Sequence, residues 1–462
     1  MTPDSGPNVT AGDVGRDYQL AVRALAERGR FGIRLGLGRT RALLRELGNP
    51  ERTFRGALVA GTNGKGSVLA LAASALRAAG VRTGETPKPH LISYRERLQI
   101  DGRPIDPATF ARLVSETLPA AERVARRLGP PTEFELLTAV IFRWFAAADL
   151  EVALVEVGLG GRLDATHAWD GGVAVVTNVS LDHMDRLGTT IPAIAREKAA
   201  IIMRGDLAVT GATGEGLAVV RRRARRLSVP LTEAAPARLV GWDRDGIEVD
   251  LPSLGRTRVG LRGRHQAANV AVADAMLDAL EQAGITTVPS EARRRGYAAA
   301  RWPGRLELID VDGRDVLLDG AHNPAGAASL AKTLDDLRPF LTGGDRADPP
   351  PPTLVVASMA DKDVDGIIRA LRAADSLRGA RIIATQIHLS RALPATALAE
   401  RWRVLAPELG VEAIADLDAA LRRSLAVGSG PVIVAGSLYL VGEARRRWHD
   451  DPLLHDPEIR GS

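Results

Sequence analysis

Short apolar runs rich in valine, leucine and isoleucine alternate along the chain with longer Ala-, Leu- and Arg-rich segments of helical period. Apolar runs of about five residues are typical of buried parallel strands, and the longer segments are typical of the helices that connect them. The pattern therefore predicts an α/β fold with a mainly parallel sheet and helices on both faces. In the first part of the chain, the expected strands are 55–60, 152–157, 173–177 and 207–210, and the expected helices are 67–79, 191–202 and 215–227.

A change of pattern divides the chain near residue 300. Short alternating runs over residues 239–261 predict small antiparallel strands, and an amphipathic helix follows them. The Arg- and Ala-rich segment 289–303 ends at a Trp-Pro pair and is interpreted as a hinge, because strand and helix alternation restarts beyond it. In the second domain, the expected strands are 315–319, 353–358, 381–385 and 431–435. The expected boundaries are 1–15 for a disordered N-terminus, 16–295 and 303–448 for the two domains, and 449–462 for a tail.

The composition of the 462-residue chain narrows the class of protein. Hydrophobic residues make up 45%, yet no uninterrupted apolar run approaches the ~18 residues that span a bilayer. The absence of cysteine excludes disulfides, thiolate metal sites and cysteine nucleophiles. The net charge is +5, but the basic residues are scattered among 56 acidic ones and no nucleic-acid-binding module is recognisable, so nucleic acid is not an expected partner. Because the N-terminus lacks the order of a secretory signal, we expect a cytoplasmic protein with no membrane partner.

Lysine is rare in a chain that otherwise uses arginine. The five lysines are Lys65, Lys88, Lys198, Lys332 and Lys362. Arginine keeps its proton and has a wider, planar head, so a retained lysine marks either random drift or a place that needs a compact ammonium. Lys198 lies on an otherwise apolar helix face, where a bare ammonium is costly to bury. We expect it either to pair with an acid or to be chemically modified.

A glycine-rich loop follows the first expected strand. Residues 61–67 read GTNGKGS and precede a helical segment. Glycines let backbone amides approach a phosphate, while Lys65 can neutralise the terminal phosphates and Ser67 offers a hydroxyl to magnesium. The loop departs from the usual P-loop pattern, because Val59 replaces the first glycine and Gly66 separates Lys65 from Ser67. It indicates a triphosphate site, with a Gly-rich strand-to-helix turn as the structural alternative.

Acidic residues and a histidine follow the next two expected strands. Glu156 ends a buried strand, where an unpaired carboxylate is costly, so we expect either a metal cation or Arg162 beside it. Asp182, His183 and Asp185 come after the following strand. A lone histidine there is more often a hydrogen-bonded structural residue, but the combination with Glu156 and the phosphate loop favours a magnesium site.

Polar residues of the second half also follow strands. Arg305 suits phosphates and Asp319 suits a ribose, with His322 and Asn323 close by; solvated loop residues are the alternative. In open α/β sheets the ligand crevice lies outside the carboxyl ends of the strands, so two facing domains would form an interdomain site. A further group at the start of a helix either caps that helix or binds a base: His265, Gln266 and Asn269.

Taken together, the ordered motifs resemble those of the folylpolyglutamate synthase/dihydrofolate synthase family, within the Mur ligase superfamily. The resemblance runs from about residue 31 to about residue 442. The motifs are LGLGRTRALLRELGNP, GTNGKGS, PHLISYRERLQIDG, TEFELLTA, EVGLGGRLDAT, TNVSLDHMDRLG, IAREKAAII, GRHQAAN, WPGRLE, LDGAHNPAG, ADKD and GSLYLVGE. The resemblance implies an α/β fold with an N-terminal, Mur-ligase-type, P-loop ATPase domain on a parallel sheet and a smaller C-terminal Rossmann-like domain. Two departures are Lys88, where the family usually has a serine that helps to hold magnesium, and His167, where it commonly has asparagine.

The resemblance also implies roles for individual residues. ATP binding falls to Gly61, Thr62, Asn63, Gly64, Lys65, Gly66, Ser67, Asn269, Arg305, Asp319 and His322. One or two Mg²⁺ ions would be held by Ser67, Glu156, His183 and Lys198, the last of these as a carbamate. The residues matching the pterin pocket are Thr132, Phe134, Glu135, Leu163, Asp164 and Ala165, and the expected catalytic residues are Lys65, Lys198, His183 and Arg305.

The implied activity is that of an ATP-dependent carboxylate–amine ligase acting as a monomer on small molecules. The γ-phosphate of ATP would activate a pterin carboxylate as an acyl phosphate, and L-glutamate would then form the amide. The acceptor is dihydropteroate, a reduced folate or both, and the sequence leaves these choices open. Two alternatives are a Mur-type ligase for another carboxylate and amine, and an ATP-binding regulator without catalysis, for which Lys88 is the only support.

Overall fold

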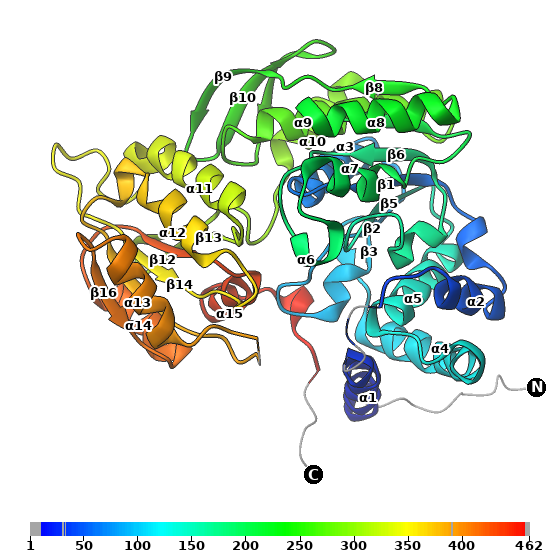
Figure 1. Ribbon diagram of the computed structural model, residues 1–462, viewed down its shortest axis with the longest axis horizontal. Helices are drawn as coiled ribbons and strands as arrows, with labels where there is room; N and C mark the ends of the chain where they lie inside the picture. Colours follow the sequence, from blue (N-terminus) through cyan, green and yellow to red (C-terminus); the bar gives the residue numbers. More distant parts are fainter. Residues whose placement is uncertain (1–10, 30–31, 33, 390, 458–462) are drawn as a thin grey trace, which may run out of the picture.

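The computed structural model describes residues 11–29, 32, 34–389 and 391–457, which form two α/β domains (Figure 1). The eight described strands of the first sheet are ordered β4-β3-β2-β5-β1-β6-β7-β8. All neighbours from β2 to β8 in this order are parallel, and β3 and β4 add an antiparallel edge. The bounds are β1 Gly56–Ala60, β2 Thr83–Thr86, β3 Gln99–Ile100, β4 Arg103–Pro104, β5 Val152–Glu156, β6 Gly172–Val176, β7 Leu207–Thr210 and β8 Leu231–Glu233. This arrangement confirms the predicted parallel sheet.

Helices cover both faces of this sheet because successive strand residues point to opposite sides. In β1, Leu58 and Ala60 pack against one set of helices, while Ala57 and Val59 pack against the other. The first set comprises α1 Ala11–Gly29, α2 Gly38–Glu46, α4 Pro107–Leu128, α5 Glu133–Ala147, α7 Ile191–Ala199 and α8 Gly214–Leu227, with the short α6 Met184–Leu187 beside α7. The second set comprises α3 Lys65–Ala78, α9 Gln266–Gln282 and α10 Ser290–Ala299. Helix α1 begins at Ala11, inside the segment expected to be disordered, and residues 1–10 lie outside the described residues.

The region expected to be the hinge is mostly helical. Helix α10 occupies Ser290–Ala299 and packs tightly against α3, with Gly296 directly against the backbone of Ala75. A small antiparallel sheet precedes it, made of β9 Arg238–Asp243, β10 Gly246–Leu251 and β11 Gly255–Val259, as the sequence predicted. The chain between α10 and β12 spans residues 300–306, which overlap the end of the segment expected to be the hinge.

The second domain is a six-stranded sheet within the described residues, ordered β12-β13-β17-β14-β15-β16, with only β12 antiparallel. Helices α11, α12 and α13 cover one face, and α14 and α15 cover the other. The strands are β12 Glu307–Val311, β13 Arg314–Asp319, β14 Thr353–Val356, β15 Arg381–Ala384, β16 Gly410–Ala413 and β17 Val432–Ala435. The helices are α11 Pro324–Leu337, α12 Val364–Arg372, α13 Ala395–Leu405, α14 Leu417–Ala426 and α15 Leu438–Trp448.

After α15 the chain turns back to the first domain, which Figure 1 shows in red. The carboxylate of Asp456 accepts a hydrogen bond from Ser93 Oγ at 2.7 Å and pairs with Arg95 Nε at 3.0 Å. Arg95 also donates to the carbonyl of His455 at 2.9 Å. Next to this returning segment lies a cavity of about 210 Å³, whose lining includes Trp302 and Leu453. The interdomain connection and the C-terminal segment therefore lie side by side.

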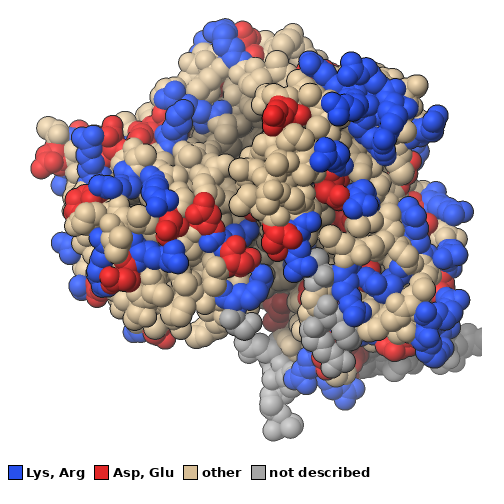
Figure 2. All heavy atoms as spheres, in the orientation of Figure 1, with Lys and Arg blue, Asp and Glu red and all other residues tan. Residues whose placement is uncertain are grey.

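Charge is distributed unevenly over the surface. Figure 2 shows a dense basic area over α8, a helix that contains Arg221, Arg222, Arg223, Arg225 and Arg226. Part of this charge is neutralised, because Arg221 forms a two-point contact with the carboxylate of Glu233 at 2.6 Å. No helix in the described part of the chain is long and apolar enough to cross a membrane.

Candidate active site

The glycine-rich loop joins the carboxyl end of β1 to the start of α3. Lys65, Gly66 and Ser67 form the first turn of α3, whose backbone N–H groups have no partner within the helix and so suit an anion. Gly64 has φ of 81°, and a Cβ there would lie 2.4 Å from Asn269 Oδ1. Glycine at this position is therefore required both by backbone conformation and by the close approach of α9.

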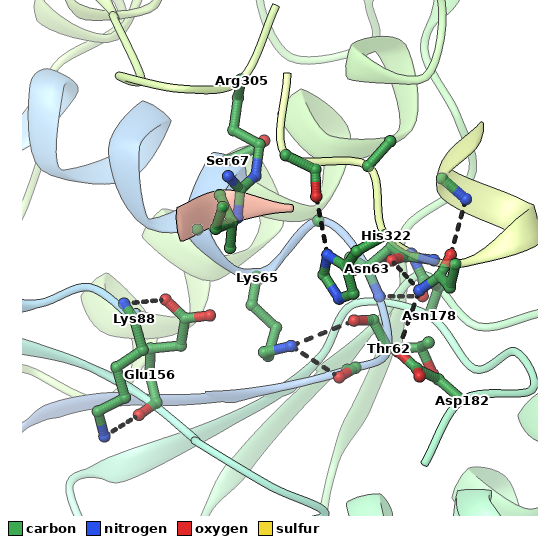
Figure 3. A pocket seen from close by; sticks show the side chains of 18 of the residues that line it. Thr62, Asn63, Lys65, Ser67, Lys88, Glu156, Asn178, Asp182, Arg305 and His322 are labelled. Carbon is green, nitrogen blue, oxygen red and sulfur yellow. Dashed lines mark hydrogen bonds between the residues drawn. The ribbon is translucent and has the colours of Figure 1, made fainter. Parts of the chain in front are cut away.

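The end of β6 holds the loop in place. Asn178 Oδ1 accepts a hydrogen bond from the backbone N–H of Asn63 at 2.9 Å, and Asn178 Nδ2 donates one to the Asn63 carbonyl at 2.9 Å. Thr177 Oγ1 donates to the same carbonyl at 2.7 Å. The ammonium of Lys65 donates to the carbonyls of Gly61 and Thr62 at 3.1 and 3.2 Å. These contacts fix the loop shape and keep the Lys65 charge inside the loop, as Figure 3 shows.

A cavity of about 570 Å³ opens between the loop and the second domain. All of the residues expected to bind ATP line it: the whole loop Gly61–Ser67, Asn269 from α9, and Arg305, Asp319 and His322 from the second domain. Glu156, His183, Lys198 and Phe134 line the same cavity. The structure therefore brings together residues that are more than 250 positions apart, at the carboxyl ends of strands from both sheets.

Direct contacts join the two domains across this cavity. Asp182 accepts a hydrogen bond from the amide of Asn323 at 3.0 Å and pairs with Lys362 at 3.3 Å. His265 Nδ1 lies 2.8 Å from Ser329 Oγ on α11. The pKa of Asp182 is lowered to about 2, because His183 and Lys362 outweigh the effect of its burial. Asp182 is thus a charged interdomain contact in the lining of the cavity.

Glu156 ends β5 and is buried, with 3% of its surface exposed. Its carboxylate accepts the backbone N–H of Lys88 at 2.9 Å, and its carbonyl accepts the Lys88 ammonium at 2.7 Å. Burial raises the pKa of Glu156, against the influence of Lys65, Lys88 and Arg305. The alternative partner, Arg162, instead pairs with Glu197 at 2.9 Å. Glu156 therefore lies in the cavity lining among Lys65, Lys88 and Arg305, and a metal cation beside it stays a prediction.

Lys198 is buried, with 5% of its surface exposed, and its ammonium donates to the Gly61 carbonyl at 2.9 Å. Burial and the nearby Lys65 together lower its pKa to about 7, against the opposing effect of Asp182. A neutral amine is the form that reacts with carbon dioxide to give a carbamate. The environment therefore makes the modified form of Lys198 chemically accessible, and no acid pairs with it among the described residues.

The metal donors do not form a compact cage. Within the described residues, no group of three or more His, Asp or Glu side chains is placed to hold a metal ion. Asp185 pairs with Arg186 at 3.0 Å on the surface and Asp182 contacts the second domain, and a contribution of either carboxylate to a metal site stays a prediction. Mg²⁺ usually takes only one or two carboxylates and completes its shell with phosphate and water. The remaining donors, Glu156, Ser67 and His183, fit such a site beside a bound triphosphate.

The second domain supplies a cation, a carboxylate and an imidazole. The carboxylate of Asp319 is held by the backbone N–H groups of Leu306 and Ala321, both at 2.9 Å. Burial raises its pKa and lowers that of Arg305, while each group partly offsets the change in the other. Burial also lowers the pKa of His322 to about 4, so His322 is a neutral hydrogen-bonding group at neutral pH.

Most of the residues expected to line the pterin pocket do not line the cavity. Of this set only Phe134 lines the cavity. Thr132 and Glu135 cap α5 reciprocally, and Glu135 also pairs with Arg39 at 2.9 Å. Asp164 accepts the N–H groups of Gly158 and Leu159, which do line the cavity. These acids therefore position the cavity wall. Leu163 and Ala165 flank Asp164 outside the lining.

Several lining residues were not assigned from the sequence. They are Arg97, Val157, Gly158, Leu159, Gly160, Asn178, Trp302, Ser329 and Leu438. Trp302 lies against the loop, since a Cβ on Gly66 would come within 2.5 Å of its ring. In the sequence, only the position of Trp302 beside Pro303, near the end of the first domain, indicates that it could lie at the cavity.

Comparison with known proteins identifies close relatives over nearly the whole chain. The family model described as the C-terminal domain of dihydrofolate synthetase matches residues 306–447. The dihydrofolate synthase/folylpolyglutamate synthase of Mycobacterium tuberculosis is 36% identical over 465 residues, with 90% of each chain covered. The structure of Mycobacterium tuberculosis folylpolyglutamate synthase complexed with ADP and AMPPCP has a TM-score of 0.83 and 32% identity, covering 95% of this chain and all of the other. E. coli FolC in complex with DHPP and ADP has a TM-score of 0.78 and 28% identity, covering 92% of this chain and 97% of the other.

Proposed function

This chain belongs to the folylpolyglutamate synthase/dihydrofolate synthase family, and we propose that it joins L-glutamate to a pterin carboxylate at the expense of ATP. The observation that carries the proposal is the shared cavity. The phosphate loop, Lys198 and Glu156 of the first domain face Arg305 and Asp319 of the second across a single space of about 570 Å³. A nucleotide and a second substrate can therefore meet there.

ATP binds with its phosphates on the loop. The N–H groups of the first turn of α3 and the Lys65 ammonium surround the phosphates on one side, and Arg305 approaches from the other. We place the nucleoside beside Asn269 and Asp319, which line the same cavity as the loop. Lys65 exchanges its contacts with the Gly61 and Thr62 carbonyls for phosphate oxygens when ATP binds.

The acceptor carboxylate attacks the γ-phosphorus, the bond to the bridging oxygen of ADP breaks, and an acyl phosphate forms. The unprotonated α-amine of glutamate then attacks the acyl carbon, inorganic phosphate leaves, and the amine loses a proton as the amide forms. Because neither step requires a covalent enzyme intermediate, catalysis is positioning and charge stabilisation by Lys65 and Arg305. Closure of the two domains through Asp182 keeps water from the acyl phosphate.

Mg²⁺ belongs to this proposal. Ser67, Glu156 and His183 would hold it together with the carbamate of Lys198, and the ion would withdraw charge from the transferring phosphoryl group. The low pKa of Lys198 supports the carbamate. Intact-mass measurement of protein kept in bicarbonate tests it. A mass about 44 Da above the calculated one in the wild type, but not in Lys198→Arg, supports the modification. A wild-type mass equal to the calculated one contradicts it. The monomeric state and the cytoplasmic location stay predictions.

The choice of acceptor is tested by ADP release from purified protein with Mg-ATP and glutamate. We expect stimulation by dihydropteroate, by tetrahydrofolate or by both, and each result assigns the corresponding activity. Lys65→Met should abolish the stimulation, whereas Lys332→Met, on the exposed face of α11, should leave it unchanged. Absence of stimulation by either acceptor in the wild type would refute the proposed substrate class and favour a ligase for another acid.

A further inference from the structure

Lys88 is a buried cation with little to balance it. It has 8% of its surface exposed and lines the active-site cavity. Among the described residues its ammonium makes one hydrogen bond, to the Glu156 carbonyl at 2.7 Å, although an ammonium carries three donors. The ring of Phe134 lies beneath it, with the ammonium 4.3 Å from the ring centre. The carboxylates of Asp164 and Glu156 favour the charge, but neither accepts a hydrogen bond from the ammonium.

The nearby carboxylates are occupied by other groups. Glu156 Oε2 accepts the Lys88 backbone N–H rather than its ammonium. Asp164 is engaged by the N–H groups of Gly158 and Leu159 and by the hydroxyl of Thr166. The acids lower the cost of holding Lys88 in place, but its two remaining donors are free for an anion that enters the cavity.

The position of Lys88 indicates which anion it binds, the phosphates of ATP or the carboxylate of the acceptor. In Figure 3, Lys88 and Glu156 lie together at one end of the pocket, and Lys65 lies between them and Asp182. Lys65 and the α3 N-terminus already serve the phosphates. Lys88 instead lies on the side of Phe134, whose ring offers a flat apolar surface to the acceptor.

We propose that Lys88 binds the carboxylate of the acceptor and holds it for attack on the γ-phosphorus. This inference rests on the proposed function, because it assigns a residue to the acceptor of that reaction. Lys88 moves no proton in the step: it stays an ammonium, donates to the non-attacking carboxylate oxygen, and keeps that contact when the acyl phosphate forms. Its charge offsets the repulsion between the carboxylate and the phosphates.

The test compares two ligands and two proteins. Binding of dihydropteroate and of its carboxamide analogue is measured by calorimetry in the presence of ADP, for the wild type and for Lys88→Met, which has similar length and no charge. The wild type should bind the carboxylate about tenfold or more tightly than the carboxamide, and Lys88→Met should lose this difference. The variant should also lose about a hundredfold in kcat, with ADP affinity unchanged within about twofold. Lys332→Met is the control with the same substitution on the surface.

The outcomes separate this inference from the proposed function. If the wild type releases no ADP with any pterin acceptor, the proposed function fails. If the wild type is active but binds carboxylate and carboxamide equally, or if Lys88→Met keeps the difference, the assignment of Lys88 is overturned. A loss of AMPPCP affinity in Lys88→Met with unchanged carboxylate preference would assign Lys88 to the γ-phosphate instead. If Lys88→Met does not fold, Lys88→Gln is measured in the same way, and equal binding of the two ligands by the wild type overturns the assignment without any variant.

Discussion

The contact between α10 and α3 gives a prediction whose magnitude can be worked out from the structure. A Cβ on Gly296 would lie 2.3 Å from Ala75 Cα and 2.5 Å from Ala75 N. Ordinary contacts of a Cβ lie at 3.4–4 Å, so Gly296→Ala forces the two helices apart by about 1 Å. Because the obstructing atoms are backbone, no side-chain rotation can relieve the clash.

The expected cost combines two opposing terms. Overpacking costs about 1–3 kcal/mol, and more when backbone must move. Alanine gains about 1 kcal/mol over glycine in a helix interior. We therefore expect Gly296→Ala to lower the free energy of unfolding of the first domain by about 2 kcal/mol. Since α3 also carries the phosphate loop, displacement of α3 should weaken ADP binding as well.

Urea unfolding followed by circular dichroism measures the stability, and hydrogen exchange of residues 65–78 and 290–299 locates the change. Gly38→Ala is the matched control, because Gly38 begins α2 and a Cβ there meets nothing within 4 Å. That variant should be unchanged or more stable by up to about 1 kcal/mol. Equal stability of Gly296→Ala and Gly38→Ala would refute the packing argument.

Three further predictions follow from contacts elsewhere. Burial and the neighbouring Asp170 carboxyl raise the pKa of Asp206 to about 7, so the protonated form favours the folded state and stability falls as pH rises from about 4 to about 7. Asp206→Asn should therefore match the wild type near pH 4 and exceed it by about 2 kcal/mol at pH 8 in thermal unfolding; a pH-independent difference would contradict this. Lys362→Met removes the partner of Asp182 and should lower kcat about tenfold without changing ADP affinity, and adding Asp182→Asn should cost little more; additive losses in steady-state kinetics would show that the two act separately. Thr132→Ala removes the cap of α5 and should cost about 1 kcal/mol in urea unfolding, whereas Thr132→Ser should not.

The sequence predicted those parts of the fold whose local pattern and tertiary role agree. The runs that became β1, β5, β6 and β7 are apolar because helices cover both faces, and the glycine-rich loop carries its own turn chemistry. Strand β2, Thr83–Thr86, was missed because it contains a glycine and the buried Glu85. Glu85 is tolerated there because Arg77 of α3 pairs with it, and no local pattern reveals such a partner.

Some residues of the site could be predicted from the local sequence, and others could not. The loop, Glu156 and Lys198 could be predicted because each follows a strand or interrupts an apolar face. The role of Asp182 could not, because its partners Asn323 and Lys362 belong to the other domain and are 141 and 180 residues away. The helix α10 was not predicted, because its arginines and alanines are also typical of a linker, whereas the helix is held by its packing on α3.

The returning C-terminal segment is a second connection between the two domains. The chain crosses between them at residues 300–306, and the Asp456 contacts with Ser93 and Arg95 tie them a second time beside that crossing. Further contacts join the domains elsewhere, since Arg244 pairs with Asp315 and Arg264 donates to the carboxylate of Asp336. A rotation of the second domain away from the first therefore has to break the Asp456 contacts as well as the Asp182–Lys362 pair, or bend the chain between α15 and Asp456.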